Sequence, residues 1–434
     1  MIEQVAFLLV LVTAVVFVVI RARRILSTLR LGRNNVLNDR KGERWKNVLL
    51  VAFGQKKMFK RPIPAILHLF VYVGFLVINI EVLEFVVDGI TGSHRIFAPF
   101  LGGFYTVLMN IFEFLAVAVL LSCVVFLIRR NVLKLRRFWT PEMKQWPRLD
   151  ANLILVTEIL LMFAILTMNA ADQILQSTQS HYTATGKLYF SSLLVPLFDS
   201  VPVPTLIVVE RFAWWFHIIG ILGFAVYITY SKHLHIFLAF PNTYYARLEQ
   251  KGHMVNMPVV TNEVRTMLGL TDTNGEPPAE PGRFGAKDVN DLNWNILLAA
   301  YSCTECGRCT AECPANITGK KLSPRKIIMD TRDRLEEVGA SIAKGGQGLA
   351  DGKSLLDNYI TREEINACTS CNACVEACPV LINPLETIME LRRYVAMEES
   401  GSPAAWNAMF QNVETNFAPW KFAPSDRFNW ASNT

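Results

Sequence analysis

Five long hydrophobic runs dominate the first half of the chain and predict membrane-spanning helices. A helix needs about 20 apolar residues to cross the ~30 Å hydrocarbon layer of a bilayer. The first run has Glu3 where a signal peptide would be basic, and the basic segment 21–24 follows it, so we interpret it as a span. The five runs cover residues 2–20, 63–87, 103–128, 152–171 and 204–239.

The pattern changes after the fifth run, and the rest of the chain predicts shorter helices. Gly275–Pro278 and Pro281–Gly282 interrupt a mixed polar stretch, which we interpret as a linker. Helices then begin at Ser323–Pro324 and Asn383–Pro384, because each pair supplies an N-cap and a first-turn proline. We expect an all-α protein with four segments: a five-helix transmembrane bundle (1–240), a cytoplasmic linker (241–295), a small helical domain (296–400) and an aromatic-rich tail (401–434).

Composition and charge agree with this division. Of the 434 residues, 52% are hydrophobic and only 18% are charged, below the ~25% typical of soluble domains. The net charge is +6, but residues 1–245 hold 24 Lys/Arg and 13 Asp/Glu, whereas residues 246–434 hold 19 and 24. The basic residues cluster at the ends of the apolar runs, so we expect them to face membrane lipid rather than nucleic acid.

The distribution of basic residues also predicts an orientation. Residues 21–61 hold 13 Lys/Arg and residues 129–148 hold seven, whereas the alternate loops hold only Arg95 and Lys187. Strongly basic loops remain in the cytoplasm. We therefore expect a multi-pass protein of the bacterial cytoplasmic (inner) membrane, with its N-terminus outside and the chain after the fifth run in the cytoplasm.

Eight of the nine cysteines form two copies of the pattern C-x2-C-x2-C-x3-C-P. This spacing is typical of two [4Fe–4S] clusters, in which the fourth cysteine of each copy binds the other cluster. A zinc site needs only four ligands, and disulfides do not suit a reducing compartment, so both alternatives are disfavoured. We expect one cluster on Cys303, Cys306, Cys309 and Cys378, and the other on Cys368, Cys371, Cys374 and Cys313.

Histidines within the apolar runs are candidate ligands, because polar groups are costly in lipid. His68 and His235 are expected at a similar depth near the basic end of the bundle, where two imidazoles can hold a haem iron axially. Packing without a ligand is the alternative. His217 lies 18 residues before His235 and would share its face on a continuous helix, whereas His233 would face elsewhere.

Toward the opposite end of the bundle, His217 has three open interpretations: binding a quinone, ligating a haem with another partner, or packing. Glu81 and Glu84 are expected at a similar depth. They are candidates for a quinone or proton site, and the alternative is an ion pair or hydrogen bond with His217 or Arg211.

These features resemble two known families. Five runs with His68, His217 and His235 resemble the membrane cytochrome b subunit of respiratory nitrate reductase and its relatives in sulfite-reduction and heterodisulfide-reductase complexes. That family binds two b haems through four histidines, and Ile78 stands near the fourth position here. The resemblance implies one haem b on His68 and His235, and a second if His217 has another partner. The two cysteine motifs resemble the dicluster ferredoxin domain of the heterodisulfide-reductase C type.

The tail resembles the N-P-W…R…W segment that precedes a cysteine-rich domain of the heterodisulfide-reductase B type in related iron–sulfur oxidoreductases. Two interpretations remain open: the tail packs on the chain's own helices, or it docks a separate cysteine-rich protein of that type. Its aromatic residues are Trp406, Phe410, Phe417, Trp420, Phe422, Phe428 and Trp430.

No nucleophile–base pair, dinucleotide fingerprint or P-loop is present, so no catalytic residue is predicted. The sequence favours an electron-transfer subunit of an oxidoreductase that partner subunits complete. Electrons would pass between a flavoprotein or cysteine-rich partner, the two clusters, haem b and the quinone pool, with menaquinone favoured. One alternative is quinol-driven reduction of a cytoplasmic disulfide or sulfur compound through a heterodisulfide-reductase-like partner. Another is a structural or assembly subunit.

Overall fold

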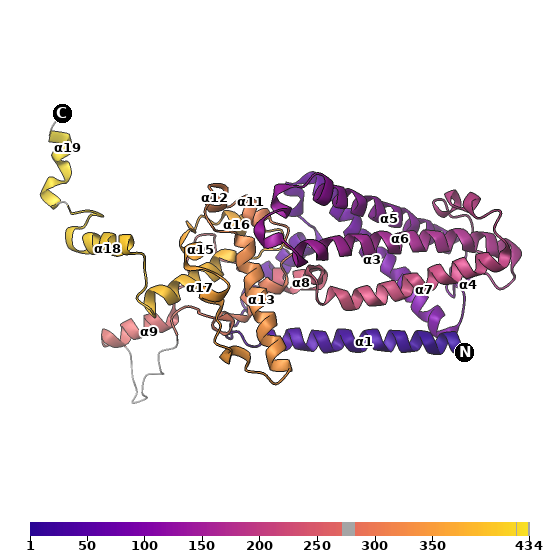
Figure 1. Ribbon diagram of the computed structural model, residues 1–434, viewed down its shortest axis with the longest axis horizontal. Helices are drawn as coiled ribbons and strands as arrows, with labels where there is room; N and C mark the ends of the chain where they lie inside the picture. The colour runs from indigo at the N-terminus through magenta and orange to yellow at the C-terminus, as the bar shows by residue number, and fades with distance from the viewer. Residues whose placement is uncertain (271–282, 422, 433–434) are drawn as a thin grey trace.

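The computed structural model describes residues 1–270, 283–421 and 423–432. Figure 1 shows an elongated molecule with long helices at one end, a compact helical domain at the other, and the N-terminus at the end of the bundle far from that domain. All regular elements in these residues are helical, and two isolated β-bridges are the only extended pairings among them. The predicted all-α class is confirmed.

Five helices are long and apolar enough to cross a membrane. Their contacts close a ring in the order α1, α3, α5, α6 and α7. These helices are α1 (Ile2–Leu29), α3 (Pro62–Thr91), α5 (Gly103–Leu127), α6 (Trp146–Thr178) and α7 (Val203–Ile228).

The bundle has an apolar interior and an apolar exterior. Phe7, Ile78, Val119 and Trp214 meet inside the ring. Large apolar side chains also cover the outward faces, among them Leu83, Phe114, Leu121 and Phe212, each more than half exposed. So much exposed apolar surface is unfavourable in water and suits a hydrocarbon surrounding.

A glycine allows α1 to approach α3 closely. A Cβ at Gly89 would lie 2.7 Å from the ring of Phe7, a distance that real Cβ atoms do not adopt. Phe7 is almost fully buried and its ring centroid lies 5.9 Å from that of Trp214. The absent side chain at Gly89 therefore lets one aromatic residue join α1, α3 and α7.

The predicted fifth span of 204–239 is wrong as a single helix. The helix α7 ends at Ile228, a short 3-10 turn covers Lys232–Leu234, and α8 (His235–Tyr244) follows. The backbone at Ser231 is extended, and its side-chain oxygen accepts a hydrogen bond from the amide of His233 at 3.0 Å. Ser231 thus caps a new turn instead of continuing α7.

The compact domain consists of short helices around two longer ones. Its helices are α10 (Trp294–Tyr301), α11 (Arg308–Ala311), α12 (Pro314–Ile317), α13 (Pro324–Ala343), α14 (Leu355–Asn358), α15 (Arg362–Asn366), α16 (Ala373–Ala377) and α17 (Pro384–Met397). The remaining α-helices are α2 (Lys41–Asn47), α4 (Ala98–Leu101), α9 (Pro258–Met267), α18 (Ala404–Asn416) and α19 (Asn429–Ser432).

Both predicted helix starts are confirmed. Ser323 accepts a hydrogen bond from the amide of Lys326, Asn383 accepts one from the amide of Glu386, and each is followed by proline at the first helical position. Such caps satisfy amides that the first turn cannot pair internally.

The compact domain packs directly on the end of the bundle. Ile25, Ile154 and Phe224 of the membrane helices belong to the same buried cluster as Ile327 and Leu391 of the domain. Polar contacts cross this seam too: Arg21 pairs with Glu336 at 2.7 Å, and the hydroxyls of Thr28 and Tyr301 lie 3.0 Å apart.

The predicted linker is only partly described. Its breakers Gly275–Pro278 and Pro281–Gly282 lie outside the described residues. Residues Ala286, Val289 and Leu292 are fully buried in the core of the compact domain, although they precede the predicted domain boundary at 296.

The tail stands away from the rest of the molecule in Figure 1. Neither α18 nor α19 has a buried residue, and Trp420 and Trp430 are 60% and 74% exposed. Phe422 lies outside the described residues. The described helices of the tail therefore bury no side chain against the chain's other helices.

Candidate functional site

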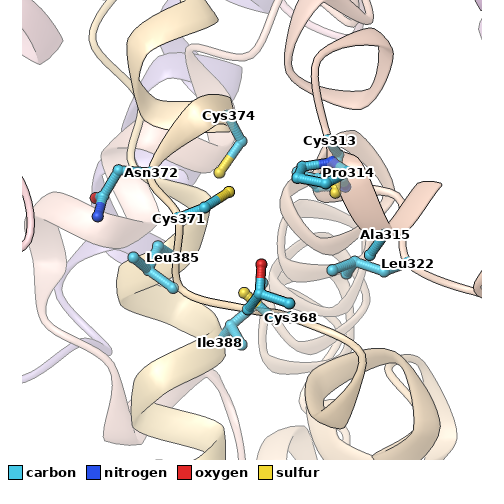
Figure 2. A pocket seen from close by; sticks show the side chains of 12 residues that line it. Cys313, Pro314, Ala315, Leu322, Cys368, Cys371, Asn372, Cys374, Leu385 and Ile388 are labelled. Atoms are coloured by element: carbon cyan, nitrogen blue, oxygen red, sulfur yellow. The ribbon is translucent and has the colours of Figure 1, made fainter. Parts of the chain in front are cut away.

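Four cysteines from both motifs surround one small cavity. Figure 2 shows Cys371 and Cys374 on one side and Cys313 on the other, with Cys368 below them. Cys313 precedes α12, Cys368 and Cys371 lie in the loop that leads into α16, and Cys374 lies in the first turn of α16. Leu322, Leu385 and Ile388 add apolar walls, which is typical of the surroundings of an iron–sulfur cluster.

The other four cysteines gather around the first motif. Cys303 and Cys378 share a buried cluster with Ile328 and Ile382. Burial raises the pKa of Cys309 well above its usual value, and the charges of Cys306, Cys303 and Cys378 raise it further. Each motif therefore lies with the fourth cysteine of the other copy, the arrangement that a crossed dicluster site requires.

The two motifs also have the same backbone shape. Glu305 and Ser370, each just before the second cysteine, have φ values of 52° and 56°. Gly307 and Asn372, each just after it, have φ values of 69° and 60° and precede α11 and α16. A Cβ at Gly307 would lie 2.4 Å from a guanidinium nitrogen of Arg325, so glycine is required there for space as well.

Burial favours the protonated thiol at Cys303, Cys374 and Cys378. Desolvation raises the pKa of Cys303 to about 12, that of Cys374 to about 12 and that of Cys378 to about 11. Cluster binding must displace these protons, so the affinity for the cluster depends on pH. Because the unfolded chain has no preformed site, the free energy of cluster binding also stabilises the folded domain. The amides of Ile382 and Ser370 donate to the sulfurs of Cys378 and Cys368 at 3.2 and 3.4 Å, bonds that also stabilise thiolates.

The described cysteines do not converge on a site for a single metal ion. Among the described residues, no three His, Cys, Asp or Glu side chains lie close enough to hold a single metal ion. In a four-iron cube each thiolate binds a different iron, so the thiolates stand further apart than around one ion.

A second candidate site lies where the membrane helices meet the compact domain. The rings of His68 on α3 and His235 at the start of α8 are 6.5 Å apart between centroids. A metal bound at about 2 Å by both imidazoles would place the rings about 6 Å apart. The Nδ1 atom of His68 is buried without a hydrogen-bond partner. These two side chains would suit the iron of a haem as ligands.

The sequence argument placed the neighbouring histidines wrongly. Because α7 ends at Ile228, His217 and His235 are not on one helix and do not share a face. The ring of His233, expected to face elsewhere, lies 5.4 Å from that of His235. The carbonyl oxygen of Lys232 lies 3.0 Å from Nδ1 of His235, which leaves Nε2 of that ring for a metal.

A buried ionic network joins this histidine turn to the first cysteine motif. The Lys232 ammonium contacts the carboxylate of Glu305, which also pairs with Arg332 at 2.7 Å. Lys232 also donates to the carbonyl oxygen of Pro147 at 2.5 Å. Burial alone would raise the pKa of Glu305, but the two cations hold it below its ordinary value. Neither Lys232 nor Glu305 is among the predicted site residues, although Glu305 directly precedes Cys306 and Lys232 lies three residues before His235.

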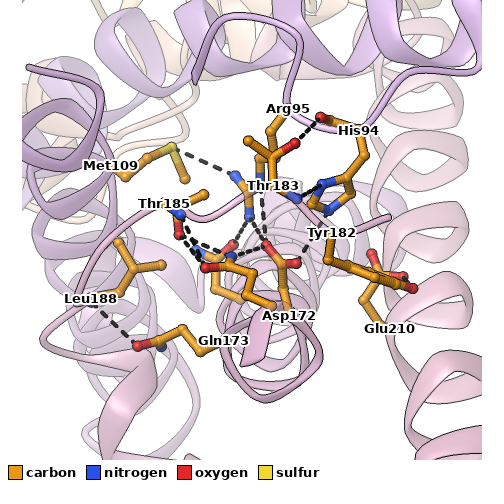
Figure 3. A network of polar contacts seen from close by, with 12 residues as sticks. His94, Arg95, Met109, Asp172, Gln173, Tyr182, Thr183, Thr185, Leu188 and Glu210 are labelled. Atoms are coloured by element: carbon orange, nitrogen blue, oxygen red, sulfur yellow. Dashed lines mark hydrogen bonds and ion pairs between the residues drawn. The ribbon is translucent and has the colours of Figure 1, made fainter. Parts of the chain in front are cut away.

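At the opposite end of the bundle, Arg95 enters the interior and organises a polar network. Figure 3 shows it above Asp172, with His94, Tyr182 and Thr185 around them. Arg95 contacts Asp172 at 3.1 Å and Asn169 at 2.6 Å, and Nε2 of His94 lies 3.1 Å from Asp172. Sequence analysis counted Arg95 only as a loop charge. Arg95 is the only Lys or Arg of its loop, and this isolation is the sequence feature that could have indicated a buried role.

The predicted residues of this end are only partly joined to the network. Glu84 accepts from the hydroxyl of Tyr105 at 2.5 Å, and Glu81 lies 3.6 Å from Arg95. The expected pairing of these carboxylates with Arg211 is not present, because Arg211 pairs with Glu210 at 2.5 Å.

His217 contacts α6 rather than the network around Arg95. Its Nδ1 lies 3.0 Å from the carbonyl oxygen of Leu161, and its ring centroid is 5.5 Å from that of Phe85. Its Nε2 is buried without a hydrogen-bond partner, as are both carboxylate oxygens of Glu81.

Comparisons with known proteins agree with the cysteine pattern. Residues 302–382 match the family described as "4Fe-4S dicluster domain", so the chain carries two [4Fe–4S] clusters. It is 28% identical over 98% of its length to the "Probable iron-sulfur-binding oxidoreductase FadF" of Bacillus subtilis. It is 27% identical over 91% of its length to the "EtfAB:quinone oxidoreductase" of Syntrophomonas wolfei. The chain spans 60% and 54% of these two relatives.

A third relative matches a much shorter part of the chain. Over 23% of its length, the chain is 34% identical to one component of the ferredoxin/F(420)H(2)-dependent CoB-CoM heterodisulfide reductase of Methanosarcina acetivorans, and it spans 49% of that component. No solved structure matches the chain. Together the relatives and the apolar helices indicate a membrane-associated electron-transfer protein of the oxidoreductase type.

Proposed function

We propose that this chain is a quinone-linked electron-transfer subunit of the bacterial inner membrane. It would carry electrons between a cytoplasmic donor, two [4Fe–4S] clusters, one haem b and the menaquinone pool. The observation that carries the proposal is the contact between the first cysteine motif and the histidine turn, through Glu305 and Lys232. The clusters and the haem, when bound, accept and release single electrons.

The proposed route assigns a task to each group of residues. Cys313, Cys368, Cys371 and Cys374 would hold one cluster, and Cys303, Cys306, Cys309 and Cys378 the cluster beside the histidine turn. His68 and His235 would ligate the haem iron as neutral imidazoles, and burial lowers the pKa of His235 in the direction that keeps it neutral. No residue of this chain acts on a substrate by acid–base or nucleophilic chemistry in this scheme.

The distal residues would serve quinone or proton exchange. Glu81 and His217 have buried polar atoms without hydrogen-bond partners, as expected for groups that await a ligand or a proton. Glu84 and Asp172 connect this region to the polar network around Arg95. His217 would also be the ligand if a second haem were present.

Two kinds of partner are proposed for the cytoplasmic side. The name of one relative refers to an electron-transfer flavoprotein and quinone, and that of another to heterodisulfide reductase. We propose that an electron-transfer flavoprotein supplies electrons and that the exposed aromatic tail docks a cysteine-rich protein of the heterodisulfide-reductase B type. Deleting residues 404–434 should abolish binding of such a partner and leave the iron content unchanged.

Cofactor stoichiometry on the purified full chain tests the main proposal. We expect about eight non-haem irons from two four-iron clusters and one b-type absorption band. The substitutions H68A and H235A should each remove the haem band and retain the iron, whereas H217A should retain both. Absence of any b-type band from the wild type would overturn the haem assignment and leave an iron–sulfur protein on a five-helix anchor.

The alternative is the reverse direction, in which quinol drives reduction of a cytoplasmic disulfide or sulfur compound. The similarity to a component of a heterodisulfide reductase favours this candidate. Membranes containing the chain distinguish the two directions. Reduction of the haem by a reduced flavoprotein but not by menaquinol supports the first, and the opposite result supports the second.

A further inference from the structure

A basic cavity lies at the seam between the membrane helices and the compact domain. One wall is the approach to α3, with Lys60 and Arg61, and the other wall is the chain that leaves α5. Pro62 and Ile63 at the start of α3, and Leu135 opposite them, supply apolar surface. The cavity opens at the surface of the molecule. It is lined by five basic side chains: Lys60, Arg61, Arg129, Arg136 and Arg137.

Most of this charge is not neutralised by the protein. Arg61 pairs with Glu312 at 2.9 Å, and Lys60 contacts Glu376. Among the described residues, the side chains of Arg129, Arg136 and Arg137 form no ion pair with a carboxylate, and the guanidinium of Arg137 lies 4.8 Å from the ring centroid of Phe138. The Nε atom of Arg137 is also buried without a hydrogen-bond acceptor. Three guanidinium groups without a carboxylate partner around one cavity favour an anion from outside the chain.

The start of α3 adds to the positive potential. No side chain caps this helix, and Pro62 occupies its first turn. The partial positive charge of a helix N-terminus favours an anion within the first turn. The guanidinium groups without carboxylate partners and the uncapped helix are two independent features of the same region.

We propose that this cavity binds the phosphate of an anionic phospholipid headgroup. Arginine suits phosphate because its planar fork donates two parallel hydrogen bonds. The cavity lies where a membrane-spanning helix begins, which is the depth of headgroups, and its apolar rim can receive the glycerol and the first acyl carbons. A free phosphate ion would use the charge but not the apolar rim.

The position of the cavity gives this lipid a structural role. Glu312 directly precedes Cys313, and Glu376 lies between Cys374 and Cys378, so the two acidic partners of the cavity belong to the cluster motifs. A lipid phosphate bound beside them would join the membrane helices to the domain that holds the clusters. This inference does not depend on the haem or on the direction of electron flow.

Titration of the full chain in an uncharged detergent with short-chain phosphatidylglycerol tests the proposal. Arg129 and Arg136 make no side-chain contact with a carboxylate among the described residues, so R129Q/R136Q is expected to fold. We expect it to raise the dissociation constant by about thirtyfold, the effect of two basic residues near an anionic lipid. The matched control R23Q/R30Q removes two exposed arginines from the same end of the bundle, on α1 and at its C-cap, and should change the dissociation constant less than twofold.

Two further titrations identify the source of the phosphate. Short-chain phosphatidylcholine and inorganic phosphate should each bind at least tenfold more weakly to the wild type. If both double variants lose the same affinity for phosphatidylglycerol, the proposal is wrong and the lipid responds only to diffuse surface charge. If inorganic phosphate binds the wild type as tightly as phosphatidylglycerol does, the ligand is a free phosphate and not a lipid. If R129Q/R136Q loses iron, R136Q alone decides the question, because Arg136 is exposed. It should then weaken phosphatidylglycerol at least threefold.

Discussion

At the scale of single residues, Lys232 has the most consequential position in the molecule. Its carbonyl oxygen orients His235, and its ammonium contacts Glu305 inside the first cysteine motif. The pair is almost fully buried, at 8% and 3% exposure, so water cannot replace the interaction. One residue therefore contacts both candidate redox sites.

Replacing Lys232 with methionine should destabilise the compact domain strongly. Breaking a buried ion pair by removing one partner typically costs about 3–5 kcal/mol, and in K232M the carboxylate of Glu305 keeps only one of its two cations, Arg332 at 2.7 Å. We expect K232M to lower the melting temperature of the detergent-solubilised chain by several degrees, and K232M/E305Q to lower it further, because the second substitution removes the Glu305 carboxylate from Arg332.

An exposed ion pair of the same domain supplies the control for this comparison. Lys321 and Glu363 are 72% and 60% exposed and lie 2.7 Å apart, so K321M should have almost no effect. Equal effects of K232M and K321M would show that the buried pair is not important for stability.

The crossed assignment of cysteines can also be tested residue by residue. Cys313 lies in the first motif but lines the cavity of the second. We expect C313S and C371S to alter the same electron paramagnetic resonance signal, and C378S and C306S to alter the other. If C313S instead matched C306S, each motif would bind its own cluster and the crossed arrangement would be wrong.

At the scale of elements, close helix contacts determine which substitutions the bundle tolerates. Gly89 faces Phe7 across the α1–α3 contact, and α1 also carries Arg21 and Thr28 to the compact domain. Overpacking of a tight contact typically costs about 1–3 kcal/mol. We expect G89V to lower the melting temperature and G89V/F7A to restore part of it.

Gly223 on α7 provides the matched control, because nothing lies within 4 Å of a Cβ placed there. The substitution G223V should be nearly neutral in the same melting experiment. A loss as large as that of G89V would show that β-branched residues are poorly tolerated in these helices generally, independent of the contact with Phe7.

The elements also show which features could be predicted from the sequence. Hydrophobic runs and Pro-based caps are local signals, and the five long helices and the starts of α13 and α17 follow them. The break at Ser231 could not be predicted from hydrophobicity, because apolar residues continue on both sides of it. The hydroxyl of Ser231 bonds Asp150 of α6 at 2.6 Å, a tertiary contact that no local pattern reveals.

Some residues of the candidate sites could likewise be predicted from the sequence, and others could not. The spacing of the cysteines indicates their chemistry directly, because cluster ligands lie close together in sequence. The histidine pair was anticipated from depth alone, by an argument that wrongly assumed one continuous helix. Lys232, Glu305 and Arg95 depend on partners more than 70 residues away or on another helix, so their roles emerge only in three dimensions.

At the scale of the whole molecule, the orientation in the membrane determines the class of partner. The basic cavity, the histidine pair and both cysteine groups all lie toward the compact domain, whereas the network around Arg95 lies at the other end of the bundle. Free thiols and iron–sulfur clusters suit a reducing compartment. The same end holds the excess of basic residues, which favours the cytoplasm.

Labelling of introduced cysteines in intact cells tests this orientation. Ser180 and Lys344 are exposed residues at opposite ends of the molecule, in the loop before α7 and just after α13. A membrane-impermeant maleimide should label S180C in intact cells, and should label K344C only after the cells are opened. The reverse pattern would place the clusters outside the cytoplasm, and flavoproteins and thiol substrates of the cytoplasm would no longer be available as partners. Retained iron in both variants shows that the labelled protein is folded.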